Sequence, residues 1–136
     1  MKSPTMIFAF LLAGSFLSIA SATVPPVPIT KQADIEATQG LDISVGIGNG
    51  VARLVTLDAE PKLGERLRHV RLQIIKDDKT VFDAPLMTES TDKGYRVTFA
   101  IDSDLAQDAV VVVSFGTKER AQRRYRIRLR AFIPNR

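Results

Sequence analysis

The chain has 136 residues, of which 19 are lysine or arginine and 15 are aspartate or glutamate, giving a formal net charge of +4. It has no cysteine, which excludes disulfides, thiolate zinc sites, cysteine nucleophiles and a lipid-modified cysteine. The mild positive charge does not by itself predict a nucleic-acid partner.

Residues 1–22 have the three parts of a secretory signal peptide. Lys2 supplies the positive start, an apolar run extends from Met6 to Ala20, and Ala20-Ser21-Ala22 places small residues before a cleavage site. The run is shorter than the roughly 20 residues of a spanning helix, although a retained membrane anchor remains the alternative. We expect cleavage after Ala22 and no transmembrane anchor afterwards. The expected location is periplasmic or secreted, and bacterial, because cysteines and N-x-Ser/Thr sites are both absent.

The mature chain begins with a proline-rich segment. Pro25, Pro26 and Pro28 lack amide protons and hold the backbone extended. We therefore expect residues 23–32 to form a tether or a loose first edge. Residues 33–136 are expected to form one domain, and the mature length is sufficient for one hydrophobic core.

Apolar and polar residues alternate with period two over most of that domain, which is typical of β-strands. Such segments occur at 41–47, 51–58, 69–75, 80–83, 95–101 and 125–131. Residues 110–115 are continuously apolar and rich in β-branched side chains, which favours a strand buried on both faces. Residues 102–108 are expected to form a polar loop with one short helical turn.

Seven to eight short strands at this spacing predict an all-β sandwich. The chain is similar in length and strand rhythm to immunoglobulin-like and fibronectin-III-like sandwiches. It lacks the cysteines and tryptophan of true immunoglobulin domains, so the prediction concerns the architecture and not membership of a family.

Arginine occupies every second position near the C-terminus, at Arg124, Arg126, Arg128 and Arg130, and Arg123 precedes them. In a strand, the four alternate side chains would project from one face about 6.6 Å apart. Such a row suits a polyanion, because guanidinium groups bind oxyanions through charge-assisted, often bidentate hydrogen bonds.

Two alternatives remain for this segment. The arginines could form a solvated outer face balanced by acids such as Asp83 or Asp102, with little energetic consequence. Residues 118–132 can also be drawn as a basic amphipathic helix. A helix would scatter the arginines around its circumference, so we favour the strand.

The other motifs are weak. Gly46-x-Gly48-x-Gly50 is interpreted as a hairpin turn and not as a phosphate-binding loop. His69 is the only histidine, and no sequence pattern links it to a nucleophile and a carboxylate. Asp102-Ser103-Asp104 lacks the glycine and glutamate of an EF-hand loop. We expect no catalytic residue, no metal site and no cofactor.

These observations predict a non-enzymatic binding or accessory module of the envelope or secreted fraction. It would engage an envelope protein or an anionic envelope polymer through Arg123, Arg124, Arg126, Arg128 and Arg130. Nucleic acid is not expected as a partner, because few aromatic residues accompany the arginines. One alternative is a structural subunit of fimbrial or surface-layer type that assembles by strand addition, with residues 23–37 donated. The least favoured alternative is a small hydrolase.

Overall fold

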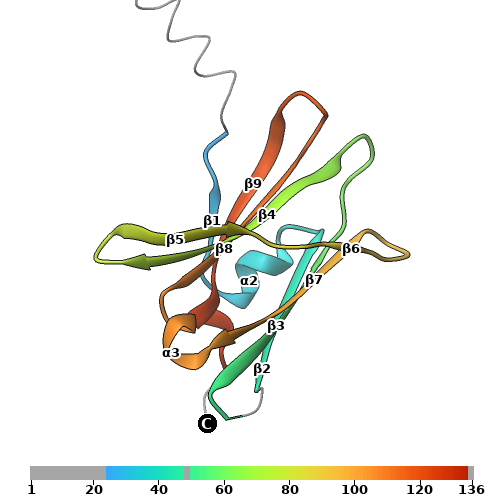
Figure 1. Cartoon of the computed structure of the whole chain (residues 1–136). Helices are drawn as coiled ribbons and strands as arrows, with labels where there is room; N and C mark the ends of the chain where they lie inside the picture. The colour runs from blue at the N-terminus through green and yellow to red at the C-terminus, as the bar shows by residue number, and fades with distance from the viewer. Residues whose placement is uncertain (1–23, 48–49, 135–136) are drawn as a thin grey trace, which may run out of the picture.

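The computed structural model describes residues 24–47 and 50–134. Nine strands in these residues form two sheets that share one apolar core, with two short α-helices and one 3-10 helix (Figure 1). The prediction of an all-β sandwich is therefore confirmed, although the described residues contain nine strands and not the expected seven to eight. The predicted signal peptide and part of the Gly48-Asn49-Gly50 turn lie outside the described residues.

The first sheet, here called the β8 sheet, has five strands. Their order is β1 (Val27–Ile29), β9 (Ala121–Arg128), β8 (Ala109–Gly116), β4 (Arg66–Lys76) and β5 (Lys79–Pro85). The pairs within this sheet are antiparallel, except that β1 runs parallel to β9.

The second sheet, here called the β3 sheet, has four strands. Their order is β2 (Leu41–Ile47), β3 (Ala52–Ala59), β7 (Tyr95–Asp102) and β6 (Glu89–Ser90), and every pair is antiparallel. Helix α2 (Gln32–Glu36) joins β1 to β2 and so connects the sheets, and α3 (Ser103–Ala106) connects them again between β7 and β8. The short turn α3 agrees with the expectation for residues 102–108.

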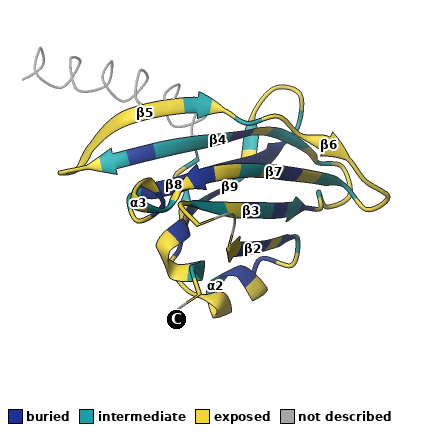
Figure 2. Ribbon diagram, turned by 60° about the horizontal axis from the view of Figure 1, so that its bottom comes forward, coloured by how far each residue is buried: buried dark blue, intermediate teal, exposed yellow. Residues whose placement is uncertain are grey.

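The core lies between the sheets and is centred on β8. All eight residues of β8 are buried, whereas exposed and buried positions alternate along β2 (Figure 2). Val111, Val113 and Phe115 point inward and are fully buried. The central position of β8 in its sheet explains the continuous apolar sequence, because both of its faces are covered.

The N-terminal part of the domain contains a first edge strand, which was one of the two expectations for residues 23–32, and a helix that the sequence pattern did not predict. Residues 27–29 form the edge strand β1, and Ile29 of this strand is only 1% exposed. Helix α2 follows and buries Ile35. An element of five residues is too short to show a helical period, so the pattern gave no signal for it.

The C-terminal segment is a strand as far as Arg128, which confirms the preference for a strand over a helix there. The expected continuation to Ala131 is wrong, because Leu129–Phe132 form a 3-10 helix. This turn keeps Leu129 fully buried. No helix in the described part of the chain is long and apolar enough to cross a membrane.

Candidate anion-binding face

Three arginines of β9 project from the outer face of the β8 sheet. Tyr125 and Ile127 are buried on the inner face, so Arg124, Arg126 and Arg128 point the other way. These three residues are called the arginine face below. The structure thus brings together three of the five arginines that the sequence singled out.

The part of the outer face of β8 beside the arginine face consists of one serine and two valines. Arg124, Arg126 and Arg128 lie opposite Ser114, Val112 and Val110 of β8. On its other edge, β8 pairs with β4. There Ser114, Val112 and Val110 lie opposite His69, Arg71 and Gln73, in that order. Val110 and Val112 are each only 5% exposed, which fits covering by the long side chains of both flanking strands. The outer face is therefore a polar surface over a narrow apolar floor, with basic side chains on both sides.

The acids that were considered as counterions do not balance the arginine face. Asp83 binds Arg71, with 2.8 Å between Oδ1 and Nε. Asp102 belongs to the other sheet and accepts a hydrogen bond from the backbone N–H of Asp104. In residues 24–47 and 50–134, no carboxylate lies within 4.0 Å of a guanidinium nitrogen of the arginine face.

Arg124 is held in place by neutral groups. Its Nε donates to Ser114 Oγ at 3.3 Å, and its Nη1 donates to the carbonyl of Val24 at 3.1 Å. Both contacts leave the positive charge without a counterion, so they position the guanidinium without neutralising it.

Arg130 lies beyond the strand, in the 3-10 helix, and is exposed. It nevertheless lines the same hollow as Arg126 and Arg128, a cavity of about 390 Å³ at this end of the sheet. Asp77, Asp78 and Asp108 line this cavity as well. At this end of the sheet, the cavity is therefore lined by both positive and negative side chains.

Arg123 is not part of the arginine face, which corrects its expected position beside the row. Its guanidinium binds the carboxylate of Glu65 with three contacts of 2.7 to 3.0 Å. It also lies 4.3 Å from the centre of the Phe115 ring and donates to the Tyr125 hydroxyl at 3.0 Å. Successive residues of a strand point to opposite faces, so Arg123 lies on the side of Tyr125.

The pKa of His69 is affected by the positive charges of the outer face. Partial burial and the nearby charges of Arg124, Arg68 and Arg71 lower the pKa of this histidine from its ordinary value. The sequence pattern placed His69 and Arg71 on one strand face but did not link them to the arginines of β9. That link depends on both strands pairing with β8, which no local signal specifies.

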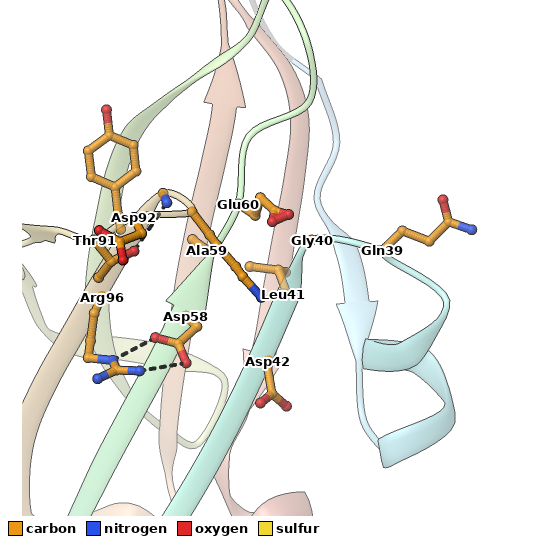
Figure 3. Close-up of a pocket in the computed structure, with 13 residues that line it drawn as sticks. Gln39, Gly40, Leu41, Asp42, Asp58, Ala59, Glu60, Thr91, Asp92 and Arg96 are labelled. Carbon is orange, nitrogen blue, oxygen red and sulfur yellow. Dashed lines mark hydrogen bonds and ion pairs between the residues drawn. The ribbon is translucent and has the colours of Figure 1, made fainter.

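A different cavity, of about 560 Å³, lies at one end of the β3 sheet (Figure 3). Its lining includes Asp58 and Arg96, which face one another with contacts of 2.7 and 3.3 Å, while Gln39 extends away from them. The arginine of this cavity already has its carboxylate partner. The arginine face is therefore the stronger candidate site for an external anion.

No three histidine, aspartate or glutamate side chains gather into a group that could hold a metal ion in the part of the chain that the structure describes. A scan of protein-family models, a search of curated proteins and a search of solved structures each return no match for this chain.

Proposed function

We propose that the mature chain is a non-enzymatic binding module of the bacterial envelope or the secreted fraction. It binds an anionic polymer or an acidic protein surface through Arg124, Arg126 and Arg128. The observation that carries this proposal is the row of three guanidiniums with no carboxylate partner among the described residues. Neighbouring like charges repel, and a bound polyanion relieves this repulsion while forming charge-assisted hydrogen bonds.

The proposal includes the secretory signal in residues 1–22 and an immunoglobulin-like topology. The order β2-β3-β7-β6 corresponds in chain sequence to the A-B-E-D sheet of immunoglobulin domains. The order β9-β8-β4-β5 corresponds to the G-F-C sheet with one added strand. The parallel strand β1 then extends the β8 sheet beyond β9.

A non-enzymatic role is supported by the surroundings of His69. The cavity that it lines also contains Arg66, Leu67, Arg68, Tyr95 and Lys118, which offer one hydroxyl and no carboxylate. A histidine base usually depends on an orienting acid and a nucleophile within hydrogen-bond distance. The cationic surroundings of His69 suit anion binding better than proton abstraction.

The test is binding of the mature protein, residues 23–136, to long-chain polyphosphate and to polygalacturonate, with dextran as the uncharged reference. Titration calorimetry at about 20 mM and 300 mM salt compares the native chain with the double variant Arg126→Glu, Arg128→Glu. We expect affinity to fall at least about tenfold in the variant and in high salt, because the interaction is largely electrostatic.

The matched control is Lys62→Glu, Lys93→Glu, which changes the net charge equally at two exposed loop positions. This variant is expected to keep most of the affinity. Equal losses in both double variants would reduce the effect to overall charge and contradict a site on the arginine face.

The second candidate function is assembly by strand addition. Strand β6 pairs only with Tyr95 and Arg96, so the rest of that edge of β7 has no strand partner among the described residues. An apolar cavity of about 340 Å³ adjoins this edge and includes Val81, Phe82 and Leu105. An open edge beside an apolar groove can accept an extended strand.

The expected donor for this assembly, residues 23–37, overlaps β1 and α2, and Val27–Ile29 already pair with β9. Donation would therefore require exchange of β1 between copies. Light scattering over a concentration series tests the candidate, with Ala100→Lys placing a charge on the open edge. A native chain that stays monomeric at millimolar concentration would remove this candidate.

A further inference from the structure

A small cavity at the end of the sandwich where β4 begins has an unusually basic lining. Its volume is about 290 Å³, and its lining residues are Arg66, Leu67, Arg68, His69, Tyr95 and Lys118. We propose that this cavity binds a single tetrahedral oxyanion of the phosphate or sulfate type. The inference goes beyond the proposed function, because no residue of the arginine face lines this cavity.

Arg68 gives the first argument for an anion. The pairing of β4 with β8 shifts between Leu67 and His69, which leaves Arg68 in an irregularity of the strand. One of its terminal nitrogens donates to the carbonyl of Thr117 at 2.5 Å. Its Nε is buried and has no hydrogen-bond partner among residues 24–47 and 50–134. A buried, unpaired donor on a charged group is costly. The same side chain lines the cavity, so an oxyanion bound there that drew Nε out of its buried position would relieve this cost.

Lys118 and Arg66 give the second argument, because they reach the cavity from different elements. Arg66 opens β4 and lies opposite Gly116 of β8. Lys118 belongs to the β8–β9 turn, which is closed by the hydrogen bond from Thr117 N–H to the Arg120 carbonyl at 3.0 Å. The contact between Arg68 and Thr117 ties this turn to β4. The cations are thus brought together by the fold before any anion binds, which lowers the entropic cost of binding.

His69 gives the third argument and supplies a reporter. The positive groups that act on it are Arg124 of β9 and Arg68 and Arg71 of its own strand. Arg66 and Lys118 line the same cavity. Tyr95 of β7 faces the same cavity, while the nearby acid Asp83 is engaged by Arg71. An oxyanion in the cavity offsets the charges that lower the pKa of His69. Binding therefore raises this pKa, and by linkage the anion binds more tightly as the pH falls through it.

The experiment follows the imidazole signals of His69, the only histidine of the chain, by NMR in the mature protein. The pH is titrated in sodium chloride and in sodium sulfate at equal ionic strength, because sulfate keeps a constant charge over this range. We expect the pKa of His69 to be about 0.5 or more higher in sulfate, a difference readily measured for histidine. Acetate, which is planar and singly charged, is expected to have less effect.

Two double variants test whether the sulfate-dependent rise in the pKa of His69 comes from this cavity. Arg66→Gln with Lys118→Gln removes exposed cations of the cavity and is expected to abolish the sulfate-dependent rise. Arg126→Gln with Arg128→Gln lies outside the cavity and is expected to preserve it. Unfolding midpoints of both variants establish that the fold is intact.

An unchanged pKa in sulfate, an equal rise in acetate, or an equal rise in Arg66→Gln, Lys118→Gln would overturn the proposal. The result is separable from the polymer titrations. A native chain that shows the sulfate effect but binds neither polymer contradicts only the proposed function, whereas a native chain that binds the polymers but shows no sulfate effect contradicts only the oxyanion site.

Discussion

Arginines of the same strand β9 have different roles, as Arg123 and Arg128 illustrate. The Arg123–Glu65 pair is largely shielded, with side chains 14% and 9% exposed, and the arginine lies over the Phe115 ring. Arg128 is exposed and has no carboxylate within ion-pair distance among the described residues. At the scale of single residues, the first arginine stabilises the fold and the second is available to a partner.

Arg123→Gln is therefore expected to lower the free energy of unfolding by about 2–4 kcal/mol, because it leaves a shielded carboxylate without its partner. Arg128→Gln, the matched control on the same strand, is expected to change it by less than about 0.5 kcal/mol. Urea denaturation of the two variants measures the difference. Equal effects would mean that Arg123 acts as a surface residue.

The same pair predicts a pH dependence. Hydrogen bonds from Arg123 lower the pKa of Glu65 below its ordinary value. A lowered folded-state pKa stabilises the fold above the unfolded value of about 4.3, and this contribution is lost as the pH falls through the folded pKa. The stability gap between the native chain and Glu65→Gln is thus expected to be largest near pH 7 and to shrink below about pH 4. Thermal unfolding of both proteins across this range checks it, and a gap independent of pH would contradict it.

The turn between β8 and β9 leaves no space for a side chain at Gly116, the last residue of β8. A Cβ on Gly116 would lie 2.2 Å from the Arg120 carbonyl oxygen and 2.8 Å from the Ala121 Cα, both backbone atoms that cannot yield cheaply. A Cβ on Gly46 of β2 would meet nothing closer than the Leu54 carbonyl oxygen at 3.9 Å. The two glycines therefore differ in the space around them, although both belong to strands.

Gly116→Ala is expected to destabilise the domain by about 1–3 kcal/mol through this overlap. Since the same turn carries Lys118, it is also expected to weaken the sulfate effect on His69. Gly46→Ala is expected to be neutral or slightly stabilising, because alanine restricts the unfolded chain. Denaturation midpoints compare the two, and similar losses would show that the turn has room to adjust.

In the whole molecule, part of the N-terminal segment belongs to the sandwich. Strand β1 pairs with β9 and packs against the core, so the segment is not a free tether along its full length. Ile29 is 1% exposed in the shared core, whereas Val27 of the same strand is 51% exposed. The parallel pairing of β1 with β9 also places Pro28 opposite Arg126, beside the arginine face. The first strand thus contributes both to the core and to the edge of the candidate site.

Ile29→Ala is expected to cost about 2–5 kcal/mol, as for other large-to-small changes in a core. Val27→Ala on the same strand is expected to cost less than about 1 kcal/mol, because its side chain is half exposed. Thermal unfolding distinguishes the two. A small effect of Ile29→Ala would mean that β1 detaches readily from the domain.

The sequence by itself determined the local features of this protein. Alternation with period two predicted the main strands and the sandwich, and the apolar run of 110–115 predicted the doubly buried β8. The same alternation placed Arg124, Arg126 and Arg128 on one face. These predictions succeed because the direction of a side chain depends only on the strand to which it belongs.

Tertiary structure decided which of these faces meet. Arg123 binds Glu65, which lies 58 positions earlier, and Arg68 contacts Thr117, 49 positions later. The neighbours of the arginine face on β4 and the basic cavity beside Arg66 depend equally on strand order and register. Register is set by burial and turn geometry across the whole sandwich, so residues distant in sequence become one site only when the chain folds.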